Sequence, residues 1–233
     1  MTMADDPNAG TGLKDLGRKY LDLLLDGRRF EAMEAVVSRV GEGLPVGSVY
    51  VDVLQPVMYE VGKLWQADEI DIATEHYVTA ATQLLMARLF PRALANRRIS
   101  RSMVGACLGS ELHELGMRMV CDLFEFEGWD TYFLGAVTPG QSLIKIVQAR
   151  KPDLVCLSAT MAFGLPKIRD VVRSLRVPGE SGTPRIMVGG LPFLINPGLC
   201  TTVGADATAP DARRAVRVAD SLFGQGGRDA AQI

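Results

Sequence analysis

The chain of 233 residues is long enough for one large domain or two small ones, and 48% of its residues are hydrophobic. Its formal net charge of −2 argues against a dedicated nucleic-acid surface. The acidic N-terminus shows no secretion signal and no apolar run is long enough to span a membrane, so we expect a cytoplasmic protein.

In the first half of the chain, apolar residues recur at helical spacing. We expect residues 1–12 to be disordered and residues 13–96 to fold as a four-helix bundle. The third helix contains Pro56, which predicts a kink, and Asp71 is a suitable N-cap for the fourth. The helical segments are, in order, Leu16–Leu24, Phe30–Val37, Val49–Gly62 and Asp71–Leu89.

In residues 97–224, short apolar runs alternate with helical segments. This alternation predicts a parallel sheet with right-handed crossovers, and five such units fit a flavodoxin-like, doubly wound α/β domain. Residues 225–233 are expected to be a flexible tail. The predicted strands are Met103–Leu108, Thr131–Leu134, Leu154–Leu157, Arg185–Val188 and a short strand near Asp206.

Several residues suited to ligand binding follow directly after these strands. His113 follows the first strand, Ser158 and Thr160 follow the third, and Gly189 and Gly190 follow the fourth. Ligands of doubly wound sheets bind at the carboxyl ends of the strands, and neutral imidazole is a good ligand for transition metals. Taken singly, the small residues also fit ordinary turn chemistry.

Glu111 lies two residues before His113. A carboxylate this close in sequence can hydrogen-bond to a metal-binding imidazole and thereby fix its tautomer. The alternative is that Glu111 and Glu114 are simply acidic residues favoured near a helix N-terminus.

The helical half contains the second of the two histidines, His76, which directly follows Glu75, itself ten residues after Trp65. Adjacent helical residues point about 100° apart, so Glu75 and His76 can both border one flat ligand without sharing a narrow stripe. The alternative is a core aromatic residue near a polar pair at the surface.

The segment Glu111-Leu112-His113-Glu114-Leu115-Gly116 resembles the D-x-H-x-x-G signature of base-off, His-on cobalamin-binding domains. The resemblance covers residues 13–224. It implies that His113 is the lower cobalt ligand in place of dimethylbenzimidazole, and that Ser158, Thr160, Gly189 and Gly190 accommodate the displaced nucleotide tail. It also implies that the helical bundle caps the upper face of the corrin.

The spacing W-x9-E-H from Trp65 to Glu75-His76 resembles that of CarH-type adenosylcobalamin photoreceptors. This resemblance implies that Trp65 and Glu75 surround the adenosyl group, and that His76 is the upper cobalt ligand after photolysis. We expect Ile72 to be a further cofactor-binding residue. Glu111 stands where aspartate is usual, so we expect its extra methylene to lengthen or re-aim the contact with His113. Thr160 stands where leucine is usual. The CarH-type photoreceptors are repressors with a winged-helix DNA-binding domain, and no such domain is recognisable in this sequence.

From this resemblance we expect a non-catalytic light sensor that binds adenosylcobalamin, changes its domain arrangement or association on photolysis, and signals through a partner protein. Self-association as a homo-oligomer is left open, and neither direct nucleic-acid binding nor membrane binding is expected. One alternative is a corrinoid methyl carrier of a methyltransferase system, which would hold methylcobalamin or hydroxocobalamin. Another is a sensor of the same fold that binds haem or a protein.

Overall fold

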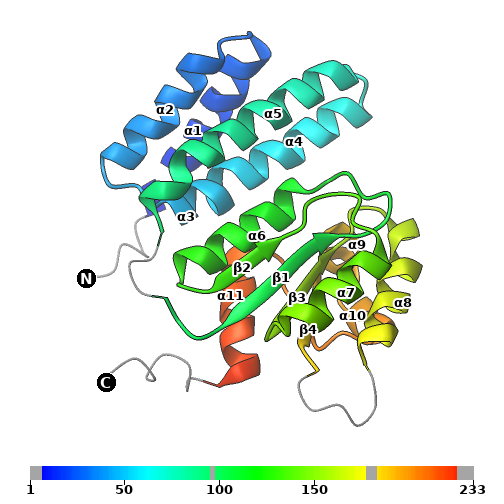
Figure 1. The fold of residues 1–233 in the computed structure, drawn as a ribbon. Coiled ribbons are helices and arrows are strands. Elements are labelled where there is room, and N and C mark those ends of the chain that lie inside the picture. Colours follow the sequence, from blue (N-terminus) through cyan, green and yellow to red (C-terminus); the bar gives the residue numbers. More distant parts are fainter. Residues whose placement is uncertain (1–6, 95–97, 177–182, 225–233) are drawn as a thin grey trace, which may run out of the picture. The chain divides into compact units, whose positions relative to one another are not determined.

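The computed structural model of the protein describes residues 7–94, 98–176 and 183–224 (Figure 1). The chain divides into two compact units between Ala93 and Leu94, which we call the helical unit and the α/β unit. None of the helices in the described ranges is both long and apolar enough to cross a membrane.

The helical unit is built from four main helices, which confirms the predicted bundle. Its core contains fully buried side chains from separate helices, including Tyr20, Leu54 and Leu85. The hydroxyl groups of Tyr20 and Thr82 lie 3.1 Å apart, so these two buried polar groups satisfy one another. The elements are α1 (Pro7–Leu25), α2 (Arg29–Gly41), α3 (Val46–Ser48), the π-helical segment η1 (Val49–Leu54), α4 (Gln55–Gln66), α5 (Ile72–Leu89) and the 3-10 turn η2 (Phe90–Arg92).

Two details of the helical unit differ from the expectations. Helix α1 begins at Pro7, inside the segment expected to be disordered, because proline lacks an N–H group and is well tolerated in the first turn of a helix. Residues 1–6 of that segment lie outside the described residues. The third helix changes its winding just before Pro56, which lies in the first turn of α4. A proline cannot donate the usual i→i−4 hydrogen bond, and a π-helical segment at this point fits that loss.

In the described residues of the α/β unit, five parallel strands form one sheet in the order β2-β1-β3-β4-β5 (Figure 1). This is the flavodoxin-like order, so the predicted fold class is confirmed. The strands are β1 (Ser102–Cys107), β2 (Asp130–Phe133), β3 (Leu154–Ser158), β4 (Arg185–Gly189) and β5 (Ala207–Thr208). The helices are α6 (Leu115–Phe126), α7 (Gly140–Arg150), α8 (Leu165–Leu175), α9 (Leu191–Ile195), α10 (Leu199–Val203) and α11 (Ala212–Phe223), with the 3-10 turn η3 (Ala162–Gly164) before α8.

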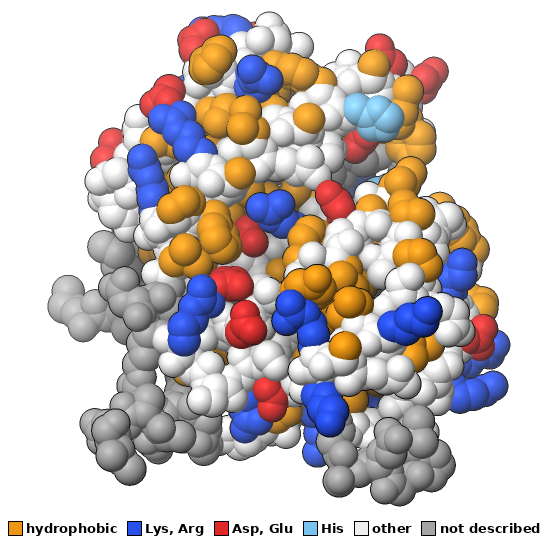
Figure 2. Space-filling model, in the orientation of Figure 1, with side chains coloured by type: hydrophobic (Ala, Val, Ile, Leu, Met, Phe, Trp, Pro, Cys, Tyr) orange, Lys and Arg blue, Asp and Glu red, His pale blue; other side chains and the backbone are white. Residues whose placement is uncertain are grey.

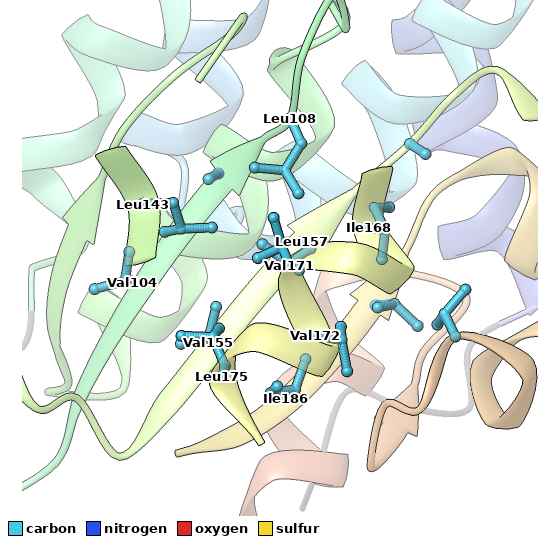
Figure 3. Packing of buried hydrophobic residues seen from close by; sticks show 14 of the residues in the cluster. Val104, Leu108, Leu143, Val155, Leu157, Ile168, Val171, Val172, Leu175 and Ile186 are labelled. Carbon is cyan, nitrogen blue, oxygen red and sulfur yellow. The ribbon is translucent and has the colours of Figure 1, made fainter. Parts of the chain in front are cut away.

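The two faces of the sheet are packed differently. Alternate residues of the central strands, among them Val104 and Val155, pack against α7, α8 and α10 in a cluster of aliphatic side chains (Figure 3). On the opposite face, β1 passes close to α6, since a Cβ added at Gly105 would lie 2.5 Å from the Sγ atom of Cys121. Gly105 therefore allows the close approach of α6, whereas aliphatic side chains such as Val104 pack on the other face.

Candidate cofactor site

The strand order reverses direction at β1, whose neighbours are β2 on one side and β3 on the other. The loops that leave β1 and β3 therefore flank the switch point of the sheet, where such folds bind their ligands. His113 lies in the loop after β1, two residues before α6 begins at Leu115. Thr160 lies in the loop after β3. The sequence therefore places both residues at the edge of the sheet that is suited to a ligand.

The Glu111 carboxylate joins these two loops. Its Oε1 atom lies 2.5 Å from Nδ1 of His113 and accepts a hydrogen bond from the His113 backbone N–H at 3.1 Å. Its Oε2 atom accepts hydrogen bonds from the backbone N–H groups of Thr160, at 2.6 Å, and Met161, at 3.4 Å. The contact with His113 is thus short rather than lengthened, and the same carboxylate also reaches the loop after β3.

The carboxylate determines which nitrogen of His113 is available. Burial of Glu111 opposes ionisation, but the hydrogen bonds from Thr160 and His113 outweigh it and lower the pKa of this carboxyl group. An ionised carboxylate only accepts hydrogen bonds, so Nδ1 of His113 must carry the proton. In neutral imidazole, Nε2 then holds the free lone pair, on a side chain that is 58% exposed, whereas the Glu111 side chain is only 5% exposed.

A row of small residues crosses three strands at the same edge. Cys107 at the end of β1 is in register with Ser158 of β3, which is in register with Gly189 of β4. Burial, reinforced by the nearby carboxylates of Glu111 and Glu114, raises the pKa of the Cys107 thiol to about 12. The thiol therefore stays protonated near neutral pH, and it is a poor competitor of His113 for a metal ion.

Gly189 is the last residue of β4 and Gly190 follows it, and the two glycines have different surroundings. Gly190 has a φ of +99°, and a Cβ at this position would overlap the backbone carbonyl of Ala159. Packing of the loops therefore accounts for Gly190 without any ligand. A Cβ at Gly189 would meet nothing closer than the carbonyl oxygen of Ala209 at 3.9 Å, so the fold itself leaves room for a larger residue there.

The loop between β2 and α7 was not among the predicted site residues, although it lies against the loop that contains His113. The Glu114 carboxylate accepts a hydrogen bond of 2.7 Å from the backbone N–H of Ala136, and Val137 donates one of 3.0 Å to the carbonyl oxygen of Glu111. Thr138 forms a bridge with Leu108 that extends the pairing of β1 and β2. Glu114 was noted only as an acidic residue near a helix start, and no local pattern reveals its partner 22 residues away.

The residues predicted in the helical unit lie around the turn between α4 and α5. Trp65 lies in the last turn of α4 and is 46% exposed, and Ile72 begins α5 and is 48% exposed. Glu75 accepts a hydrogen bond from the Thr79 hydroxyl at 2.8 Å and lies 3.5 Å from the ring of His76. This places a large exposed aromatic ring, a half-buried carboxylate and an exposed imidazole at one end of the unit.

Exposed apolar side chains are found around His113 as well. Leu112 is 72% exposed and Met161 is 46% exposed. On the face drawn in Figure 2, basic and acidic side chains are interspersed with apolar ones. Apolar residues next to an exposed metal-binding side chain are typical of a site for a largely apolar ligand.

These observations provide a test of whether the site fits cobalamin. The residues offer one exposed imidazole with a defined lone pair, a buried carboxylate behind it, and apolar side chains beside it. A cobalt ion that is already held by a corrin needs one axial ligand from the protein, not a set of three or four. The donor set and its surroundings therefore fit the group.

Comparison with known proteins gave matches along most of the chain. A family model described as a B12 binding domain matches residues 101–218, and a second model with the same description matches residues 16–90. The α/β unit and the helical unit are thus each matched by a model of this kind.

Individual relatives fall into two groups. The transcriptional repressor CarH of Myxococcus xanthus is 29% identical over 66% of this chain, which spans about half (51%) of the repressor's length. Dimethylamine corrinoid protein 1 of Methanosarcina acetivorans is 25% identical over 83% of this chain and 91% of its own length. The structure of the monomethylamine corrinoid protein of Methanosarcina barkeri superposes with a TM-score of 0.77 at 21% identity, covering 90% of this chain and 97% of that one.

Proposed function

The chain belongs to the B12-binding domain family, and we propose that it is a corrinoid carrier that holds cobalamin with His113 as the lower cobalt ligand. In this proposal the protein is not itself catalytic. It presents the upper side of the cofactor to a separate partner protein, such as a methyltransferase.

The observation that carries the proposal is the contact between His113 and Glu111. The 2.5 Å contact at Nδ1 directs the free lone pair to Nε2 of an exposed ring, which is the arrangement an axial ligand requires. Cobalamin, when bound, supplies a cobalt centre whose upper ligand can be exchanged. The residues of this chain orient the imidazole, keep its tautomer fixed and shield it with apolar neighbours.

The carrier assignment is supported by the extent of the match with corrinoid proteins. This chain covers 91% of the dimethylamine corrinoid protein, so little of that relative lacks a counterpart here. The likeness to the monomethylamine corrinoid protein likewise extends over 97% of that structure. Methylcobalamin or hydroxocobalamin is the cofactor form that a carrier of this kind would hold.

The lower-ligand role is tested by electron paramagnetic resonance of the protein loaded with reduced cobinamide. Cobinamide lacks the dimethylbenzimidazole base, so nitrogen splitting of the cobalt signal must come from the protein. We expect this splitting in the unmodified protein and in His76→Ala, and its loss in His113→Ala. The two histidines thus serve as matched controls for one another. Splitting that survives in His113→Ala would exclude the proposed ligand.

A second candidate function, an adenosylcobalamin-dependent light sensor, is favoured by the helical unit. Trp65, Glu75 and His76, which form the W-x9-E-H pattern, lie around the turn between α4 and α5. The ring of Trp65 and the imidazole of His76 are both exposed. An adenosyl group would be bordered by an aromatic ring and a carboxylate that Thr79 holds in place. Loss of that group would change the contacts made by the helical unit, and a partner protein or a second copy would read the change.

One experiment distinguishes the two functions. The protein is saturated with adenosylcobalamin or methylcobalamin in the dark, and its absorption spectrum and hydrodynamic size are measured before and after green illumination. A change in size that requires adenosylcobalamin and is abolished in Trp65→Ala supports the sensor. Tighter binding of methylcobalamin, with the same size in the dark and after illumination, supports the carrier.

A further inference from the structure

Val137 has a backbone conformation that its side chain disfavours. Its φ of +53° lies in the left-handed region, which glycine, asparagine and aspartate tolerate far better than a β-branched residue. Among the described residues, Asp68 and Lys151 share a positive φ without being glycine, but neither is β-branched. Val137 is therefore the position at which residue type and backbone disagree most.

The surrounding hydrogen bonds account for the backbone of Val137. Its N–H group donates to the carbonyl oxygen of Glu111 at 3.0 Å, and the preceding Ala136 donates to the Glu114 carboxylate at 2.7 Å. The following Thr138 donates to the carbonyl oxygen of Cys107 at 2.9 Å. These bonds fix the loop against the end of β1, whatever side chain residue 137 carries. They explain the conformation, but they do not explain the choice of valine.

Packing within the unit does not explain the valine either, because its side chain is 47% exposed. Val137 donates its backbone N–H group to the carbonyl oxygen of Glu111, so its loop lies against the loop that contains Leu112 and His113. Met161, from the loop after β3, has its N–H group 3.4 Å from the carboxylate of the same Glu111. Three exposed apolar residues, Leu112, Val137 and Met161, thus belong to the loops after β1, β2 and β3, and the latter two are each hydrogen-bonded through the backbone to Glu111, which holds His113.

We infer that Val137 is a contact residue for the bound cofactor, and that its side chain, with those of Leu112 and Met161, forms an apolar ledge beside His113. The ledge would contact the flat underside of the corrin and keep water from the bond between His113 and cobalt. This inference rests on the proposed function, since it needs a cofactor bound at His113. Strained residues that persist at binding sites commonly trade stability for such a contact.

The inference predicts opposite effects of one substitution on stability and on binding. Val137→Asn removes the apolar contact and suits the left-handed conformation, so the apo-protein should melt a few degrees higher while hydroxocobalamin binds at least five-fold more weakly. Lys151→Asn is the matched control, because Lys151 has a φ of +48° at the end of α7, in the connection to the amino end of β3. It should raise the melting temperature without changing the dissociation constant.

Both quantities are measured on the full chain, by thermal denaturation of the apo-protein and by absorbance titration with hydroxocobalamin. Leu112→Gln should weaken binding without the gain in melting temperature, because Leu112 has no left-handed strain to relieve. A dissociation constant for Val137→Asn within two-fold of that of the unmodified protein would overturn the inference and leave the proposed function intact. Failure of the unmodified protein to bind hydroxocobalamin would instead refute the proposed function.

Discussion

Replacing Glu111 with glutamine is the most direct test of how the site is held together. The carboxylate accepts short hydrogen bonds on both oxygens, from Nδ1 of His113 at 2.5 Å and from the N–H group of Thr160 at 2.6 Å. A glutamine side chain has one oxygen and one NH2 group, so either the Thr160 N–H group faces another donor, or the NH2 group faces Nδ1 of His113, which must then turn away or move its proton to Nε2. The substitution therefore disrupts either the orientation of His113 or the link to the loop after β3.

The expected loss follows from the number and type of these bonds. A hydrogen bond to a charged group contributes about 1.5–3 kcal/mol, and a donor left without a partner at a largely buried position adds to the loss. With one of the two short bonds lost, the free energy of unfolding should fall by about 2–3 kcal/mol. For a protein of this size the melting temperature should then decrease by roughly 5–10 °C. Cobalamin affinity should decrease about 10- to 100-fold, as is typical when a group supporting a metal-binding histidine is lost.

Chemical denaturation and cobalamin titration of the same preparation measure both effects. Glu127→Gln is a suitable control, because it removes the same charge from an exposed position at the end of α6. The reasoning is refuted if Glu111→Gln unfolds within about 0.5 kcal/mol of the unmodified protein, the usual range for surface substitutions, and binds cobalamin with the same affinity.

Two further predictions concern stability. Gly190→Ala should destabilise the protein by at least about 2 kcal/mol, because the new Cβ would overlap the carbonyl of Ala159 at a positive φ. The free energy of unfolding of Gly189→Ala should stay within about 1 kcal/mol of that of the unmodified protein. Equal urea midpoints for the two variants would contradict this difference. Burial raises the pKa of Tyr20 to about 12 despite its hydrogen bond with Thr82, so the folded state favours the neutral phenol. That stabilisation is complete below about pH 10 and is lost as the pH rises towards 12. The free energy of unfolding should therefore fall by up to about 3 kcal/mol over this range. Urea denaturation between about pH 9 and 12 measures this change, which should be absent in Tyr20→Phe.

The parts of the fold that could be predicted from sequence are those fixed by local pattern. The apolar run Met103–Leu108 is buried on both faces of the sheet, so its composition alone identified a strand. The N-cap at Asp71 was also predictable, because its side chain accepts a hydrogen bond from Thr74 three residues later. The start of α1 at Pro7 was missed because the polar composition of residues 1–12 outweighed the preference of proline for a first helical turn.

The candidate site could be predicted only where its partners are close in sequence. The pairing of Glu111 with His113 followed from their separation of two residues. The bond from Glu111 to Thr160 spans 49 residues and depends on how β1 and β3 lie side by side. The positive φ of Val137 is equally invisible, because residue type there predicts an extended backbone and the tertiary hydrogen bonds impose another.

The α/β unit cannot by itself decide between a carrier and a light sensor. Both functions require His113, a fixed tautomer and an apolar surface beside it, so variants of Glu111 or Val137 should affect both in the same way. The two functions differ in what happens on the upper side of the cofactor, and the residues with a proposed role there, Trp65 and His76, belong to the helical unit. A carrier should tolerate alanine at both positions as far as cofactor binding is concerned. A sensor should lose its discrimination for the adenosyl group in Trp65→Ala, while His76→Ala should leave dark binding intact and destabilise only the illuminated state.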